Sequence, residues 1–101
     1  MAASHTPPGA MPQVQNVHAK GGDNAGTCNL NWKPVKNSKN FVVEFSADPI
    51  TATSWTQAGL PTKSTFTVTG LTSGAKYWFR VAAVGTQGPG PWSDPATARA
   101  S

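Results

Sequence analysis

The stretch LTSGAKYWFRVAAVGTQGPGPWSD, Leu71 to Asp94, carries the pattern on which the fold prediction depends. From Tyr77 onward, positions of one parity hold Tyr, Phe, Val and Ala, whereas the other parity holds Trp, Arg, Ala and Val. Because successive side chains of a β-strand point to opposite faces, the alternation predicts a strand over 76–84 with one face in a core. The outer face would then carry Trp78 and Arg80, a pair that needs a structural or a functional explanation.

Six further segments show a similar alternation, and turn-forming Gly, Pro, Asn and Ser residues separate them. These segments cover 12–20, 27–32, 41–46, 54–59, 64–71 and 92–100. The core expected from the inward positions contains Trp32, Val43, Leu71, Tyr77, Phe79 and Val81. Seven strands without a helical period predict an all-β fold, either an antiparallel sandwich or a barrel.

The length of 101 residues is typical of one domain. The sequence contains no apolar run long enough for a transmembrane helix, so no membrane insertion is expected. The start, MAASHTPPGAM, lacks the charged and apolar regions of a secretory signal. We therefore expect residues 1–11 to be a disordered tail or linker and residues 12–101 to be the domain.

The formal net charge is +4, but the basic residues are scattered along the chain. Only Lys33, Lys36 and Lys39 lie close together, in an expected loop. This distribution predicts weak, salt-sensitive attraction to anionic surfaces and no specific nucleic-acid binding. The single cysteine, Cys28, allows no intramolecular disulfide and is expected to be a buried, inert thiol. The alternative is a redox or cross-linking role, if its strand lies at an open edge.

Nothing in the sequence predicts catalysis. The candidate acids and bases fall on different expected elements; they are Asp23, Glu44, Asp48, Asp94, His5 and His18. A nucleophile with its base, or a set of three metal ligands, requires groups that converge on one cleft. We therefore expect no enzymatic activity, no metal site and no cofactor.

Several parts of the chain resemble the fibronectin type III family, over about Pro12 to Ala100. Trp32 ends an alternating run and is followed closely by Pro34. The segment FVVEFS resembles the third strand of the family, and YWFRVAAV resembles the sixth. The segment GPGPWSDPATA resembles the last loop and strand.

The connection LTSGAKY resembles the tyrosine corner of the same family, with Leu71 and Tyr77 at its ends. Ser73 and Ala75 stand where the family usually has proline and threonine. A tyrosine at the start of a buried strand must satisfy its hydroxyl group, and the nearest partners are backbone groups of the preceding connection. This hydrogen bond would fix the crossover between two sheets.

The resemblance implies a seven-stranded, antiparallel, immunoglobulin-like β-sandwich with three strands in one sheet and four in the other. It also implies a non-catalytic module that acts as a spacer, a presenting platform or a protein-interaction domain of a larger extracellular or surface protein. The loop GTQGPGP lacks the Arg-Gly-Asp integrin site that some members of the family display there. The segment LTSGAKYWFRVAAVGTQGPGPWSDP resembles bacterial or phage members of the family more than animal ones.

The outer face of the 76–84 strand has two interpretations. In the structural one, Arg80 pairs with Glu44 across the sheet and stacks on Trp78, and this stiffens the sheet. In the functional one, Trp78, Arg80 and Trp55 form a flat patch that binds a protein or a glycan, because Trp and Arg are enriched at binding hot spots.

Two further residues complete the candidate surface. Trp92 is expected to fold over the end of the sandwich or over its outer face. A carbohydrate-binding accessory module is the alternative function, with Trp55, Trp78 and Gln87 as its candidate residues. A protein partner would use the Trp78/Arg80 face or the end loops, and the isolated chain is expected to be a monomer.

Overall fold

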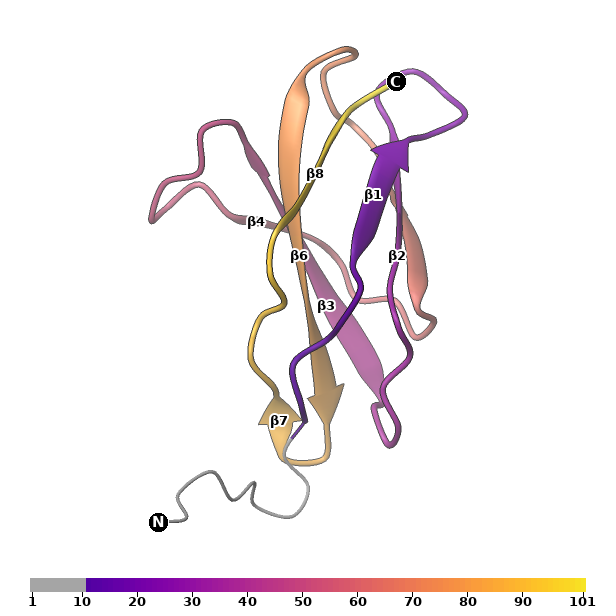
Figure 1. Ribbon diagram of the computed structural model, residues 1–101, viewed down its shortest axis with the longest axis vertical. Helices are drawn as coiled ribbons and strands as arrows, with labels where there is room; N and C mark the ends of the chain where they lie inside the picture. The colour runs from indigo at the N-terminus through magenta and orange to yellow at the C-terminus, as the bar shows by residue number, and fades with distance from the viewer. Residues whose placement is uncertain (1–10) are drawn as a thin grey trace.

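The computed structural model describes residues 11–101 and shows two antiparallel β-sheets packed face to face (Figure 1). Residues 1–10, which include His5 and most of the expected tail, lie outside the described residues. The strands are β1 (His18–Gly21), β2 (Cys28–Asn31), β3 (Asn40–Ala47), β4 (Thr56–Gly59), β5 (Thr65–Val68), β6 (Lys76–Gly85), β7 (Gly88–Pro89) and β8 (Ala96–Arg99). No helix capable of crossing a membrane occurs within the described part of the chain. The all-β sandwich prediction is confirmed.

One sheet has the strand order β1-β2-β5, and the other has the order β4-β3-β6-β7 with β8 also paired to β6. The eighth strand, β7, lies within the loop that the sequence predicted over 85–91, and the last predicted strand, 92–100, is reduced to β8. Both β7 and β8 pair with β6, and Pro91 and Pro95 lie between them. Proline has no N–H to donate to a ladder, so regular pairing stops there. Two bonds still hold this segment to β6, from Gly90 N–H to the Ala83 oxygen at 2.8 Å and from Ser93 N–H to the Val81 oxygen at 2.8 Å.

The first strand is shorter than the sequence predicted. The ladder with β2 covers only His18–Gly21 instead of 12–20. Asn16 has a φ of 59°, which is incompatible with a continuous extended strand. The segment before Asn16 remains attached to the stretch that follows β2, because Lys33 N–H donates a backbone hydrogen bond of 3.0 Å to the Gln15 oxygen.

The core lies between the two sheets, and all six residues that the sequence placed in it are buried. Trp32 is only 4% exposed, and its ring meets Phe41 edge to face with a centroid distance of 5.3 Å. Among residues 11–101 the Trp32 Nε1–H has no hydrogen-bond partner, so packing alone holds the indole. Burial of a side chain of this class contributes about 1.5–3 kcal/mol.

The tyrosine corner forms as expected. The Thr72 N–H donates a hydrogen bond of 2.9 Å to the Tyr77 hydroxyl oxygen. The same connection is fixed to the β1–β2 turn, because Leu71 N–H donates to the Gly26 oxygen at 3.0 Å. Gly26 has a φ of 75°, and a Cβ atom there would lie 2.6 Å from the Leu71 oxygen. The corner therefore needs glycine at this position in the facing turn.

Met11 packs into the sandwich, although the sequence assigned it to the tail. Its exposed fraction is 7%, and it belongs to the buried core cluster. A Cβ atom on Gly90 would lie 2.7 Å from the Met11 backbone oxygen, so the two segments touch closely. In Figure 1 this segment enters beside β7 at one end of the molecule, whereas the C-terminus lies at the opposite end.

Candidate interaction surface

The outer face of β6 carries an ion pair with β3. Glu44 and Arg80 are direct partners in the antiparallel register, as the sequence predicted. Arg80 Nη2 lies 2.6 Å from Glu44 Oε1, and Arg80 Nε donates to the same oxygen at 2.9 Å. The two side chains are 24% and 20% exposed. The pair is therefore partly shielded from water and stronger than a fully exposed pair.

Two tryptophans stack on the Arg80 guanidinium. Its central carbon lies 4.4 Å from the ring centroid of Trp55 and 4.1 Å from that of Trp92. Trp55 immediately precedes β4, and Trp92 lies in the connection between β7 and β8. The guanidinium carbon therefore lies over two aromatic rings at once. This double cation–π contact joins β6 to the residue before β4 and to the connection between β7 and β8.

The prediction that Trp78 stacks on Arg80 is wrong. Trp78 pairs with Ser46, further along β6 towards the loop that follows β3. Its Nε1–H donates to Asp48 Oδ1 at 2.8 Å, and Lys76 Nζ lies 5.0 Å from its ring centroid. Same-face neighbours on a strand point in parallel directions, so a partner that reaches over the guanidinium must come from another segment.

The flat patch expected from Trp55, Trp78 and Arg80 is also not present. The Arg80 guanidinium lies over the Trp55 ring and also over the Trp92 ring. Arg80 therefore does not lie beside these rings in one plane. Gln87 is exposed in the turn between β6 and β7. Because β6 continues to Gly85 at about 3.3 Å per residue, this turn lies more than about 15 Å from Arg80.

Ser93 was not anticipated from the sequence and fixes the position of Trp92. Its side chain is buried, and its Oγ accepts a hydrogen bond of 3.0 Å from the Val81 N–H. Gln13 Nε2 donates to the Trp92 oxygen at 3.0 Å. The sequence analysis expected Trp92 over the end of the sandwich or over its outer face. The structure places it on the outer face.

Cys28 lies in the central strand of its sheet, between β1 and β5. The open edge that a cross-linking role would require is therefore absent at this strand. The side chain has no exposed surface, and burial raises the pKa of the thiol. Both observations agree with an inert, packed cysteine.

The remaining candidates for chemistry are dispersed. Within residues 11–101, no three His, Cys, Asp or Glu side chains lie close enough to share a metal ion. Glu44 and Asp48 are engaged with Arg80 and Trp78. These observations describe a β-sandwich module in which Glu44, Asp48 and Arg80 are bonded to neighbouring side chains.

Comparison with known proteins identifies the family. The model of the fibronectin type III domain matches residues 12–99, and the chain belongs to this family. The tyrosine corner and the two-sheet topology described above agree with this family. No curated protein sequence matches the chain.

Solved structures share the fold. A Fn3-like protein from Clostridium thermocellum has a TM-score of 0.74 at 23% identity, over 92% of this chain and 94% of that chain. The FN5 domain of Drosophila Lar has a TM-score of 0.72 at 22% identity, over 90% of this chain and 97% of that one. A structure of titin kinase and its flanking domains matches 87% of this chain with a TM-score of 0.75 and 23% identity, but only 16% of its own length is covered. The fold of this chain thus also forms one part of the longer chain that contains titin kinase.

Proposed function

We propose that the chain is a non-catalytic spacer and presenting module of a larger extracellular or surface protein. The observation that carries this proposal is the placement of the two chain ends. The described chain enters beside β7 and leaves at the opposite end of a body with extents of 46 × 26 × 19 Å (Figure 1). A module of this shape adds length when it is joined in series.

The outer face supports the spacer role. Arg80 is held by Glu44, Trp55 and Trp92, and Trp78 is held by Asp48 and Lys76. A binding hot spot gains affinity when its polar groups find partners on the ligand. Here those groups already have partners within the chain, so the aromatic residues serve to brace the sheet.

Small-angle X-ray scattering on two copies joined in series tests the proposal. We expect the maximum dimension to increase by nearly the 46 Å long axis of one copy. A single copy at the same mass concentration serves as the reference, and sedimentation over a concentration series checks that it is a monomer. Two copies that fold back side by side would contradict the spacer role.

A carbohydrate-binding accessory module is the alternative. The observation in its favour is that Trp55, Trp78 and Trp92 all retain some exposed surface. A sugar stacks on an exposed aromatic ring, and Trp55 is only half-buried. Titration with polysaccharide fragments, followed by tryptophan fluorescence, separates the two functions. A saturable change that is lost in Trp55→Ala favours the alternative, and an unchanged spectrum favours the spacer.

Two finer expectations stay predictions. The extracellular location is expected because many members of the family are parts of extracellular proteins. The bacterial or phage source rests on the resemblance of the sequence alone, and the matched structures include proteins from Clostridium thermocellum at 23% identity and Drosophila at 22%.

A further inference from the structure

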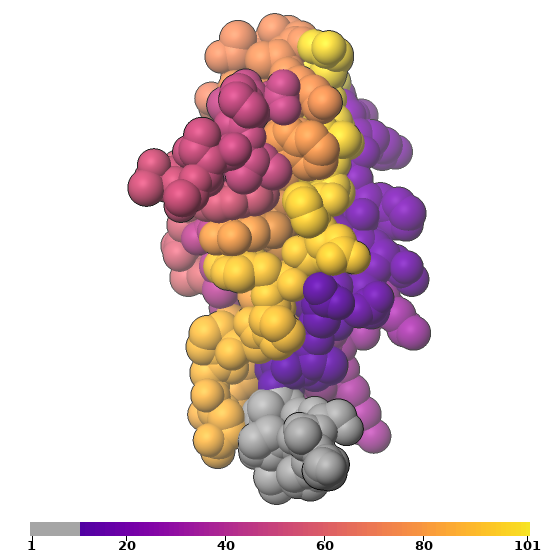
Figure 2. Space-filling model, turned by 60° about the vertical axis from the view of Figure 1, so that its left-hand side comes forward, coloured from indigo at the N-terminus to yellow at the C-terminus, as the bar shows by residue number. Residues whose placement is uncertain are grey.

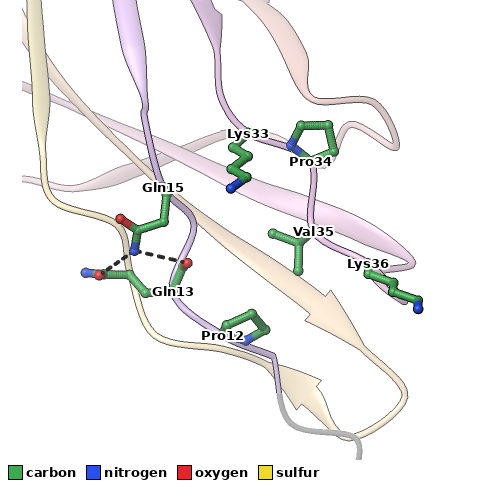
Figure 3. Close-up of a pocket in the computed structure, with 7 residues that line it drawn as sticks. All are labelled: Pro12, Gln13, Gln15, Lys33, Pro34, Val35 and Lys36. Carbon is green, nitrogen blue, oxygen red and sulfur yellow. Dashed lines mark hydrogen bonds between the residues drawn. The ribbon is translucent and has the colours of Figure 1, made fainter.

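A groove of about 330 Å³ lies at the end of the sandwich where the described chain begins (Figure 3). Two segments that are distant in sequence form its walls. One is the stretch 12–15 before β1, and the other is the stretch 33–36 after β2. The bond from Lys33 N–H to the Gln15 oxygen joins the walls at 3.0 Å, so the groove is part of the fold. Its volume is at the lower end of the range for small-ligand sites.

The apolar part of the groove is rigid. Pro12, Pro34 and Val35 supply it, and Val35 packs partly against the core cluster. In Figure 3 the Val35 side chain points toward Pro12. Proline rings have few conformations to lose, so an apolar group that settles here requires little ordering of the protein.

The polar part of the groove is basic. Lys33 points into the space between the two walls, whereas Lys36 points away from the other lining residues (Figure 3). No acidic residue lines the groove, and the one salt bridge within residues 11–101 joins Arg80 to Glu44. Asp94 lines a separate hollow that shares Gln15. The charge of the groove is therefore not neutralised by its own walls.

The amide side chains of one wall are held in place. Gln15 Nε2 donates to the Gln13 backbone oxygen at 3.4 Å and to Gln13 Oε1 at 3.1 Å. Gln13 Nε2 in turn donates to the Trp92 oxygen. The amide donors are thus directed at the protein, and Lys33 is left as the donor that faces the groove.

We propose that this groove binds a short acidic peptide segment of a partner protein. A carboxylate of the peptide pairs with Lys33 and is attracted by Lys36 at the rim. An adjacent proline or leucine side chain of the peptide rests on Pro12, Pro34 and Val35. The proposal goes beyond the spacer role, and either can fail without the other.

An NMR titration with two capped synthetic peptides tests this site. One is Glu-Glu-Pro-Leu-Glu-Glu, and its neutral counterpart is Gln-Gln-Pro-Leu-Gln-Gln. We expect saturable shifts of the Gln15, Lys33 and Val35 amides with the acidic peptide and much weaker ones with the neutral peptide. Equal shifts with both peptides, or no saturable shift with the acidic one, would overturn the proposal.

Charge-reversal variants locate the site. Lys33→Glu with Lys36→Glu is expected to lower the affinity by ~10-fold or more, because each exposed ion pair is worth a factor of ~1.5–5 and reversal adds repulsion. Lys20→Glu with Lys63→Glu makes the same change in net charge outside the groove and is expected to leave the affinity within ~2-fold. Circular dichroism confirms that each variant is folded. Equal losses in both double variants would mean general attraction to a basic domain and would overturn the proposal.

A heparin fragment tests whether any polyanion occupies the groove. We expect it to shift amides near several lysines without the selectivity of the acidic peptide. If it shifts the Gln15, Lys33 and Val35 amides as selectively as the peptide does, the groove is a site for a sulfated glycan and the peptide proposal is wrong.

Discussion

Arg80 and Glu44 face each other across β6 and β3, with Nη2 and Oε1 only 2.6 Å apart. The same guanidinium makes cation–π contacts with the indoles of Trp55 and Trp92. One side chain thus connects β3, β4, β6 and the connection before β8. The outer face of the larger sheet is held by a cross-strand brace, and this explains an arginine and aromatic residues outside the core.

We expect Arg80→Lys to destabilise the protein by about 1–3 kcal/mol. Lysine cannot donate to Glu44 from two nitrogens as arginine does. It also stacks poorly on the rings of Trp55 and Trp92, and each of these cation–π contacts contributes about 0.5–1 kcal/mol. The free energy of unfolding is measured by urea denaturation followed by tryptophan fluorescence. Arg99→Lys is the matched control, because Arg99 is exposed and makes a single bond of 3.1 Å to the Gly74 oxygen. Equal effects of the two changes would show that the brace has no energetic importance.

Removing the hydroxyl of the tyrosine corner in Tyr77→Phe should lower the free energy of unfolding by about 1 kcal/mol. The Thr72 N–H then loses its partner at 2.9 Å, while the ring remains packed against Phe45 at a centroid distance of 6.1 Å. Thermal and urea denaturation measure the change. Tyr77→Ala removes the ring as well and should cost about 3–5 kcal/mol. A Tyr77→Phe protein as stable as the wild type would contradict a structural role for this bond.

The faces of the strands could be predicted because alternation is a local property. Cys28, Leu30 and Trp32 share one parity, and all three are buried. The Glu44–Arg80 pairing was also predictable, because strand order together with the register puts these two residues opposite each other. A period of two thus determines which face each side chain occupies.

The aromatic partners of Arg80 could not be predicted in the same way. Trp92 reaches the guanidinium from an irregular connection, whose path depends on Pro91, Pro95 and the buried Ser93. Trp78 is closer in sequence, but it is directed to Asp48. The sequence of a loop has no hydrophobic periodicity from which its path could be predicted. The side-chain contacts that a loop makes are therefore seen only in the folded structure.

The position of Met11 leads to a prediction about the domain boundary. Met11→Ala should cost about 2 kcal/mol or more, because a core methionine leaves a cavity when it is truncated. A chain that begins at Pro12 should lose a similar amount. Pro12→Ala is the control at the neighbouring exposed position and should have a smaller effect. Urea denaturation of the three variants gives the values, and a Pro12 start as stable as the full chain would place the boundary after Met11.

The buried thiol of Cys28 predicts a dependence of stability on alkaline pH. Burial raises its pKa in the folded protein above the ordinary value of 9.0. Between the ordinary and the raised pKa the unfolded chain has lost the proton and the folded chain has kept it, so the free energy of unfolding falls as pH rises. The thiol's contribution is fully present well below pH 9, and it declines as the pH rises through this value, by up to about 1.4 kcal/mol per pH unit.

Cys28→Ala isolates this effect. Every other side chain is the same in both proteins, so the difference between the two curves reports the thiol. We expect the advantage of the wild type over Cys28→Ala, measured by urea denaturation from pH 7 to 10, to be constant up to about pH 8.5 and to shrink above it. A difference that does not change with pH would show that the thiol ionises as readily in the folded chain as in the unfolded one. Such ease of ionisation is incompatible with a side chain that has no exposed surface between β1 and β5.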